Sequence, residues 1–374
     1  MPAIHLLFVW LHLAGAADSS KAASRFEIER SATLETAYIM YLLAPSAKPP
    51  IVGMRPLAEE VRAYFAAYAS HASVRQLDSW IRESREKHRK GWLDWVTGMT
   101  IVSIATPRGV PNATYDRSRI DLPDFDESLP WAQLMDAANR FYREAPVAEF
   151  LAGAQPAYDC ATKEMRALLP PPNLLPTMEH YYGLRLQRYV LIPEPILNPS
   201  LNMGVPVKTS TGREAFMVMG PSVVTKDIKE FGCGYNNPEV MRSITIHEFG
   251  HSFVNPLLEK PQVKTEIGQY ACLYSPVKDE QTEQGMSDWF GTVIEHVVRL
   301  GEVRVLEGMG DKDGAQSKRI DEVFNRKTIY LPLLEDRIKE YEADRKKYPT
   351  FESFIGRLIS AFSDEPAMPS NTRH

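Results

Sequence analysis

The sequence has few cysteines, and this limits the kinds of site that they can form. Its 374 residues include only Cys160, Cys233 and Cys272, with no C-x-x-C pair and no zinc-finger spacing. An odd number allows at most one disulfide and leaves at least one thiol free. The sequence favours Cys233 with Cys272, because these two flank the histidine motif described below.

The sequence also lacks a basic excess and long apolar runs. The net charge is −5 and no long basic run is present, so nucleic acid is not expected to be the main partner. After the first residues no run reaches eighteen apolar positions, so no stable membrane span is expected. No serine nucleophile elbow, phosphate loop or dinucleotide fingerprint is present. What remains has the composition of an ordinary globular protein, with 44% hydrophobic and 24% charged residues.

The first seventeen residues are typical of an export signal. Ile4 to Leu13 is an apolar run interrupted only by two histidines, and small residues follow at 14–16, where a signal peptidase cleaves. No lysine or arginine precedes the run, so a buried N-terminal strand or helix is the alternative. We therefore predict a signal peptide over 1–17 and a secreted or periplasmic mature chain.

The remaining chain divides at a proline-rich break. Residues 18–172 are mainly helical in pattern, with a short strand predicted at 99–104, and 170–176 is rich in proline. Residues 173–374 begin with two strand-like segments, at 184–192 and 215–219, with turns predicted around 202–204 and 220–221. We predict a mainly helical N-terminal subdomain and a C-terminal catalytic subdomain, together an α+β fold with a small sheet.

One later stretch, NPEVMRSITIHEFGHSFVNP, is predicted to be a buried helix. Asn237 and Pro238 form a helix start, because asparagine caps the first amides and proline needs no N–H at the first position. Asn255 and Pro256 predict its end, because the residue before a proline is disfavoured in the α region. Apolar residues on both sides of the segment indicate an interior helix.

Within this helix, His247, Glu248 and His251 form the motif H-E-x-x-H. Residues four apart share one helix face, so the two imidazoles can bind one ion. Glu248 lies about 100° round the helix from His247 and can reach a water on that ion without binding the ion. The motif therefore predicts a hydrolytic Zn²⁺ centre with Glu248 as general base. The alternative, a core helix whose histidines bond to each other or to the backbone, buries polar groups at high cost.

A catalytic zinc takes three protein ligands, so a third ligand is expected downstream. Glu295 is favoured because it lies in the middle of a predicted helix, 286–300, whose polar face can line a cleft opposite the motif. Arg299, one turn further on, can orient its carboxylate. The other downstream acids are Glu259, Glu266, Asp279, Glu280, Glu283 and Asp288. An exposed ion pair between Glu295 and Arg299 is the open alternative.

The sequence HEFGHSFVNP, followed by the E-x-x-V-R element at 295–299, resembles the gluzincin metallopeptidases. It is most similar to an uncharacterised group of secreted bacterial proteins known only as a domain of unknown function. The resemblance implies a zincin-like fold and a zinc site whose ligands are His247, His251 and Glu295, with Glu248 as general base. It also implies a tyrosine, histidine or arginine that stabilises the oxyanion, for which Tyr330, Tyr274 and His296 are candidates.

We therefore expect a secreted zinc metallopeptidase that hydrolyses a peptide or protein substrate by Glu-assisted attack of a zinc-bound water. Two alternatives are a zinc hydrolase of non-peptide substrates and a non-catalytic binding protein on a zincin scaffold. The intact Glu248 argues against the second, because loss of the base is the simplest way to abolish activity. The sequence does not predict the cleavage specificity or the oligomeric state.

Overall fold

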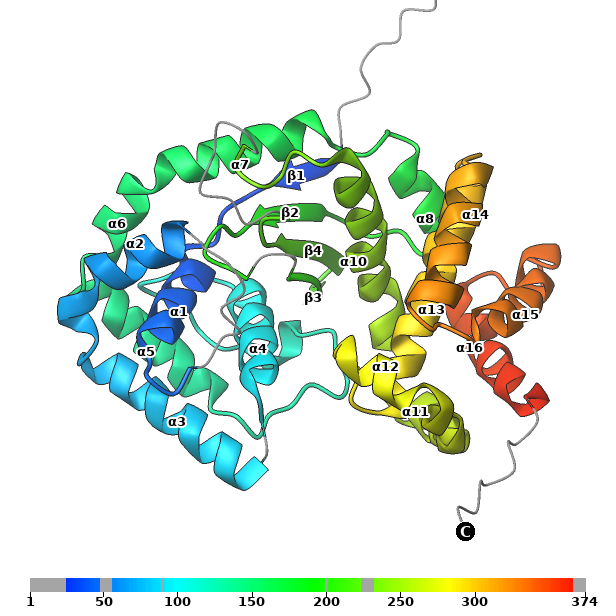
Figure 1. Ribbon diagram of the computed structural model, residues 1–374, viewed down its shortest axis with the longest axis horizontal. Coiled ribbons are helices and arrows are strands. Elements are labelled where there is room, and N and C mark those ends of the chain that lie inside the picture. Colours follow the sequence, from blue (N-terminus) through cyan, green and yellow to red (C-terminus); the bar gives the residue numbers. More distant parts are fainter. Residues whose placement is uncertain (1–24, 48–55, 89, 199–200, 223–231, 366–374) are drawn as a thin grey trace, which may run out of the picture.

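A computed structural model of the chain describes residues 25–47, 56–88, 90–198, 201–222 and 232–365. Most of these residues are helical, and a single four-stranded sheet lies in the middle of the molecule (Figure 1). The strands precede the motif helix in sequence, so the predicted α+β class with a small upstream sheet is confirmed. The predicted signal peptide lies outside the described residues.

The elements follow one another in an order that places the sheet between two sets of helices. The strands are β1 (Phe26–Ile28), β2 (Tyr189–Pro193), β3 (Asn202–Thr209) and β4 (Gly212–Met219). The helices between β1 and β2 are α1 (Ala32–Leu43), α2 (Pro56–Tyr64), α3 (Ala72–His88), α4 (Trp92–Ala105), α5 (Trp131–Glu144), α6 (Val147–Gly153), α7 (Gln155–Ala167) and α8 (Leu174–Tyr182). Those after β4 are α10 (Pro238–Leu258), α11 (Pro261–Gly268), α12 (Lys278–Glu283), α13 (Trp289–Gly308), α14 (Lys312–Ile320), α15 (Leu331–Ala343) and α16 (Phe351–Ile359).

The sheet has the order β1-β2-β4-β3. β1 and β4 run parallel to β2, while β3 and β4 form an antiparallel hairpin. β3 is therefore an edge strand, and its outer side carries an isolated bridge between Val207 and Ile120. Pro206 is suited to this edge, because proline has no N–H to donate to a neighbouring strand.

Both faces of the sheet are buried, and each belongs to a different hydrophobic core. Tyr189 and Leu191 of β2 pack into the C-terminal core, which is built mainly from α8, α10, α13, α15 and α16. Val190 and Ile192 point the other way into the N-terminal core, built mainly from α1 to α6. This explains the continuous apolar runs of β2 and β4, since a strand buried on both faces needs no polar alternation. The predicted subdomain division at 172/173 stays a prediction.

Three local predictions from the sequence are wrong. Residues 99–104 lie in α4, where burial on nearly all sides hides the helical period. Residues 202–204, predicted to be a turn, begin β3, because pairing with β4 along all eight residues overrides the poor strand propensity of asparagine and glycine. Gly301, predicted to end a helix, lies inside α13, where the Tyr182 hydroxyl occupies the place of a side chain.

No helix in the part of the chain that the structure describes combines the length and the apolar character needed to cross a bilayer.

Candidate metal centre

The motif lies on α10, a long buried helix in contact with both β3 and α13. The Asn237 side chain accepts hydrogen bonds from the amides of Glu239 and Val240, at 3.0 and 3.1 Å, as its predicted capping role requires. The predicted end at Asn255 is wrong, because α10 continues through Pro256 to Leu258. A proline so close to the end removes a single helical hydrogen bond, a cost that the packing of the last turn offsets.

The two motif histidines face each other across one turn of α10. Their Nε2 atoms are 3.2 Å apart, and their rings are nearly perpendicular. The third residue, Glu295, comes from α13, which packs closely against α10 because Gly250 leaves room for Val298. Its carboxylate oxygens lie 3.6 Å from Nε2 of His247 and 3.3 Å from Nε2 of His251.

These three distances match what a metal ion requires. Ligand atoms about 2.0–2.2 Å from a tetrahedral zinc are about 3.3–3.6 Å from one another. The two Nε2 atoms are 3.2 Å apart, Oε1 of Glu295 lies 3.3 Å from Nε2 of His251, and Oε2 of Glu295 lies 3.6 Å from Nε2 of His247. We call these three residues the triangle. The three residues therefore form a group that can hold a metal ion. The sequence prediction that Glu295 approaches both imidazoles is confirmed.

The far side of each imidazole is fixed by a hydrogen bond. Nδ1 of His247 donates to Glu302 on α13 at 2.7 Å, and Nδ1 of His251 donates to Asn255 at 3.0 Å. A proton held on each Nδ1 leaves the Nε2 lone pair directed at the centre of the triangle. Glu302 is buried and also binds Lys318 of α14 at 2.7 Å.

Arg299 combines the two roles that the sequence left open. It pairs with Glu295 one turn earlier, with 3.5 Å between Nε and the carboxylate, but it is buried rather than exposed. Its guanidinium also binds Glu322 at 3.0 Å. Arg299 therefore contacts the same Glu295 oxygen, Oε2, that lies near His247, and it can orient the carboxylate there.

The charges in this cluster shift the pKa of each candidate ligand. Burial acts to lower the pKa of His247, but the carboxylates of Glu302 and Glu295 outweigh it and raise this pKa to about 9. The pKa of His251 is also raised, because Glu295 outweighs burial. The pKa of Glu295 is lowered, because the histidines and Arg299 outweigh burial. The carboxylate is thus ionised, and the imidazoles hold the balancing positive charge.

Glu248 lies beside the triangle rather than in it. It is buried, and burial together with Glu295 raises the pKa of its carboxyl group, against the opposing effect of the histidines. A hydrogen bond from the Gly204 backbone of β3 favours the ionised form. Gly204 is required at this crossing, because a Cβ there would lie 1.9 Å from the backbone oxygen of Glu248.

The oxyanion-stabilising residues predicted from the resemblance lie elsewhere. The hydroxyl of Tyr330 donates to the carbonyl of Leu273 at 2.7 Å, and that of Tyr274 to the carbonyl of Met286 at 2.9 Å. His296 is buried, with Nδ1 bonded to the carbonyl of its own helix one turn back. None of these three candidates lines the two cavities at the triangle, so the structure gives no support to any of them.

Sequence reasoning missed Glu302, Asn255 and Lys318. The first two had a usable signal, because Glu302 follows Glu295 by seven residues, or two helical turns, and Asn255 follows His251 by one turn. Lys318 gave no such signal, because only the packing of α14 against α13 brings it to Glu302.

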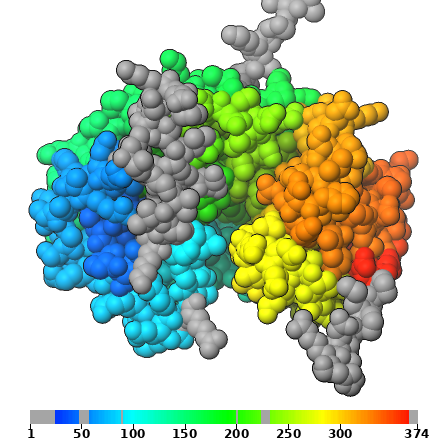
Figure 2. All heavy atoms as spheres, in the orientation of Figure 1, coloured from blue at the N-terminus to red at the C-terminus, as the bar shows by residue number. Residues whose placement is uncertain are grey.

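Two cavities meet at the triangle and share Asn202 and Glu248. The smaller, of about 270 Å³, is lined by His247, Glu295 and the charged residues behind them. The larger, of about 610 Å³, runs between α4 and α10 along the start of β3. In Figure 2 the surface is hollowed between the cyan residues of α4 and the yellow residues of α12.

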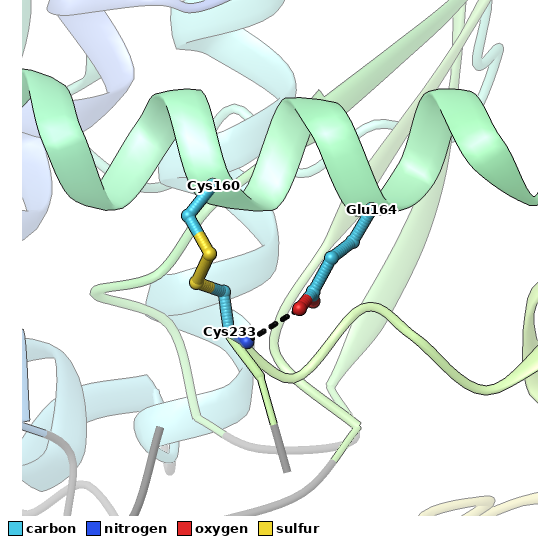
Figure 3. A group of neighbouring side chains, drawn as sticks. All are labelled: Cys160, Glu164 and Cys233. Atoms are coloured by element: carbon cyan, nitrogen blue, oxygen red, sulfur yellow. Dashed lines mark hydrogen bonds between the residues drawn. A yellow bond between two sulfur atoms is a disulfide. The ribbon is translucent and has the colours of Figure 1, made fainter. Parts of the chain in front are cut away.

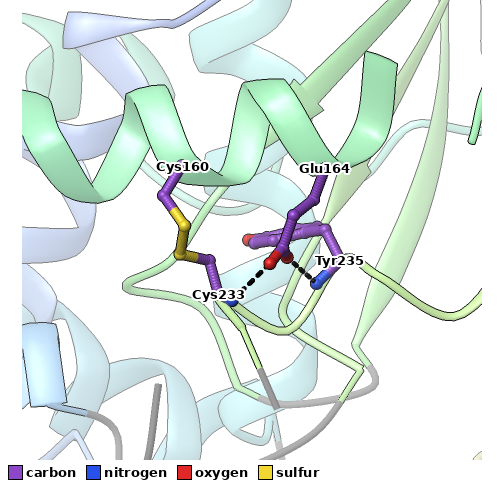
Figure 4. The surroundings of a disulfide bond; sticks show 4 residues. All are labelled: Cys160, Glu164, Cys233 and Tyr235. Atoms are coloured by element: carbon purple, nitrogen blue, oxygen red, sulfur yellow. Dashed lines mark hydrogen bonds between the residues drawn. A yellow bond between two sulfur atoms is a disulfide. The ribbon is translucent and has the colours of Figure 1, made fainter. Parts of the chain in front are cut away.

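A second group of potential metal ligands joins α7 to the segment that precedes α10. Cys160, Glu164 and Cys233 come close together, but the two sulfurs form a disulfide (Figure 3). The Glu164 carboxylate accepts hydrogen bonds from the amides of Cys233 and Tyr235, at 2.8 and 2.9 Å (Figure 4). The predicted pair of Cys233 and Cys272 is wrong, because closeness of both to the motif in sequence does not bring them together. Cys272 is exposed and free.

Comparison with known proteins identifies a family that includes the candidate centre. A family model described as a domain of unknown function (DUF4932) matches residues 127–361. The match contains Glu248 and all three residues of the triangle, and it leaves out α1 to α4. No curated protein and no solved structure matches the chain.

Proposed function

We propose that the chain, which belongs to the DUF4932 family, is a zinc-dependent metallopeptidase of the gluzincin type, on the basis of its candidate metal centre. The single observation that supports this most is the grouping of the two Nε2 atoms with the Glu295 carboxylate, at separations of 3.2 to 3.6 Å that suit zinc ligands. Glu248 stands next to the triangle and faces both cavities. Nitrogen and oxygen donors of this kind suit zinc, and three protein ligands leave a position for a reacting molecule.

In the proposed reaction, Zn²⁺ would be held by His247, His251 and Glu295, and it supplies Lewis acidity toward the substrate carbonyl and the attacking water. Glu248 takes a proton from the water and passes it to the leaving amine. Its buried position, which raises the pKa of the carboxyl group, suits both steps, because a base must also release its proton.

The surroundings of Glu248 support a peptide substrate. β3 is an edge strand whose first residues line the larger cavity beside Glu248. An extended peptide can bind along such an edge through backbone hydrogen bonds. We also propose a zincin-like fold. Two features support it: an edge strand crosses the motif helix, and a second helix provides the acidic ligand.

We further propose that the protein acts outside the cytoplasm. The Cys160–Cys233 disulfide supports this, because disulfides persist mainly in oxidising compartments.

The test combines metal analysis with digestion. The purified protein should contain about one zinc per chain and should cleave members of a mixed peptide library, and a chelator should remove both properties. A protein that contains zinc, leaves every peptide intact and hydrolyses simple esters would support a non-peptide hydrolase instead. A zinc-containing protein that binds peptides without cleaving any would support a binding role. A protein that binds no zinc would contradict the proposal.

A further inference from the structure

The larger cavity differs in charge from an ordinary peptide groove. Its lining includes five carboxylates and a single lysine, Lys90. The acids are Asp94, Asp124, Asp126, Glu248 and Glu259. Lys90 pairs with Asp126 at 2.7 Å, and Lys264, from outside the cavity, pairs with Asp124. The cavity therefore keeps a negative excess after its own ion pairs are formed.

Among the described residues, Glu248 and Glu259 are the lining carboxylates without an ion-pair partner, because Asp94 lies 3.7 Å from Lys90. Glu259 follows the end of α10, and the cations Lys264 and Arg117 act on it from beyond ion-pair distance. One of its oxygens accepts a hydrogen bond from the Asp124 amide at 3.0 Å. Burial and the nearby Asp124 raise the pKa of Glu259 to about 7, so an arriving cation would stabilise its ionised form.

The walls of the cavity suit a long side chain with a charged end. Apolar residues of α4, of the following loop and of the start of α5, including Leu93, Ile101, Phe125 and Trp131, line the cavity together with residues of α10. Lysine and arginine bury their methylene groups against such surfaces and extend their charge to a polar end. An acidic substrate side chain would instead meet the excess of carboxylates.

The distance between Glu259 and Glu248 can be estimated from their positions along α10. His251, Asn255 and Glu259 are four residues apart and all line the cavity, so one face of α10 forms its wall. The eleven residues from Glu248 to Glu259 span about 16 Å along a helix. An extended peptide covers about 3.3 Å per residue, and a lysine side chain reaches several ångströms further. A residue three to five positions from the cleaved bond can therefore contact Glu259.

We propose that Glu259 is a specificity-determining residue that binds a lysine or arginine three to five residues from the cleaved bond, so that the substrates are cationic peptides. This inference rests on the proposed peptidase function. It names the substrate class of the same cleft.

The test uses three matched pools of N-acetylated, C-amidated dodecapeptides made of neutral residues. Each pool carries one fixed central residue, which is lysine, glutamine or glutamate. Wild-type protein should cleave the lysine pool at least about tenfold faster than the glutamine pool, as expected for a charge-assisted contact. Mass spectrometry should place the cuts three to five residues from the lysine, on one side of it.

Variants assign the preference to one carboxylate. Glu259→Gln should bring the lysine and glutamine pools to equal rates, and Glu259→Lys should favour the glutamate pool. Glu60→Gln, an exposed position on α2 away from the cavity, should change nothing. Zinc content and the unfolding temperature identify a variant that has merely failed to fold. If the lysine preference is absent in wild type or survives in folded Glu259→Gln, the proposal is wrong.

A binding measurement separates this inference from the peptidase proposal. The same pools are bound to zinc-loaded Glu248→Gln protein, with and without Glu259→Gln. If wild type cleaves no pool, the peptidase proposal fails, and the binding result alone decides on Glu259. Tighter binding of the lysine pool that depends on Glu259 supports cation recognition, and equal binding of the three pools overturns it.

Discussion

The molecule contains two groups of potential metal ligands, and their comparison shows what such a group needs beyond suitable residues. His247, His251 and Glu295 on one side, and the Cys160–Glu164–Cys233 group on the other, are equally compact, with ligand atoms within 4.8 Å of one another. In the cysteine group the sulfurs are bonded to each other, and both Glu164 oxygens accept backbone hydrogen bonds. Its donor atoms are already used.

In the histidine group the donor atoms remain available. Each Nδ1 is occupied by Glu302 or Asn255, and this directs each Nε2 to the shared centre. The excess of carboxylates around the two imidazoles is the charge that a divalent cation would balance. Nitrogen atoms that hold only a displaceable proton, beside carboxylates that favour a cation, therefore distinguish the candidate centre from the disulfide, whose sulfurs are bonded to each other. Five predictions test this distinction.

The largest expected effect is on the rate of peptide cleavage, and it compares Glu248 beside the histidine group with Glu164 in the cysteine group. Glu248→Gln should keep its zinc and lose about 10²–10⁴-fold in peptide cleavage, because the amide cannot accept the proton of the water. Glu164→Gln should leave the rate almost unchanged. Steady-state rates with zinc content measured in parallel check this. Comparable cleavage by Glu248→Gln and wild type would remove Glu248 from the mechanism.

The second prediction concerns zinc content. His247→Ala and His251→Ala should each lose the zinc, of which wild type should hold about one per chain. The double variant Cys160→Ser with Cys233→Ser should keep all of it and lose about 2–4 kcal/mol of unfolding free energy. Metal analysis and denaturant unfolding measure both quantities. Equal zinc in all of these proteins would contradict the site assignment.

The third prediction concerns the ligand contributed by α13. Glu295→Ala should weaken zinc binding at least roughly a hundredfold, the upper end of what losing an outer partner costs. Glu280→Ala and Glu283→Ala, on the neighbouring α12, should be nearly silent. Competition with a chelator of known affinity measures each variant. Unchanged affinity in Glu295→Ala would show that another group completes the centre.

The fourth prediction concerns the residue behind His247. Glu302→Gln should lower zinc affinity about 10–100-fold, because an amide holds the Nδ1 proton less strongly than a carboxylate does. Lys318 pairs with Glu302, which in turn contacts His247. Lys318→Met should therefore lower the zinc affinity less than Glu302→Gln does. An unchanged zinc affinity in Glu302→Gln would mean that the ring is oriented by packing alone.

The fifth prediction concerns a dependence on pH. In the metal-free protein the pKa of His247 is about 9, above its ordinary value near 6.5, because Glu302 and Glu295 outweigh burial. The protonated ring stabilises this form fully below about pH 6.5, and the contribution is lost as the pH rises through 9. Zinc must displace the proton, so its affinity should rise by up to about tenfold per pH unit across this window. Calorimetry in buffers of different ionisation enthalpy measures the proton release, and its absence would contradict the assigned charge.

The sequence predicted the parts of the centre that are local in the chain. His247, Glu248 and His251 are positioned by one helix turn, so their relation follows from the helical period. Glu295 could be chosen because it lies on a second long helix with a polar face. Glu302 lies on the same face two turns later, and the same reasoning could have found it.

The parts that the sequence did not predict depend on tertiary contacts. The start of β3 has residues that disfavour strands, and its conformation is set by pairing with β4. Cys233 bonds to Cys160 because α7 passes beside it, at a Cα distance of 6.0 Å, although 73 residues separate them. Tyr330 is held by the carbonyl of Leu273, a contact that no spacing in the chain indicates.

The position of the cleft between the two cores separates reactivity from substrate choice. All three candidate ligands belong to α10 and α13, which pack together in the C-terminal core, whereas α4, the opposite wall, belongs to the N-terminal core. The family match over 127–361 includes the ligand helices and excludes α4. Substitutions in α4 therefore alter which molecules fit without moving a ligand atom. Redesign of selectivity can therefore begin at α4, which carries no candidate ligand, while Glu259 lies just past the end of the ligand helix α10.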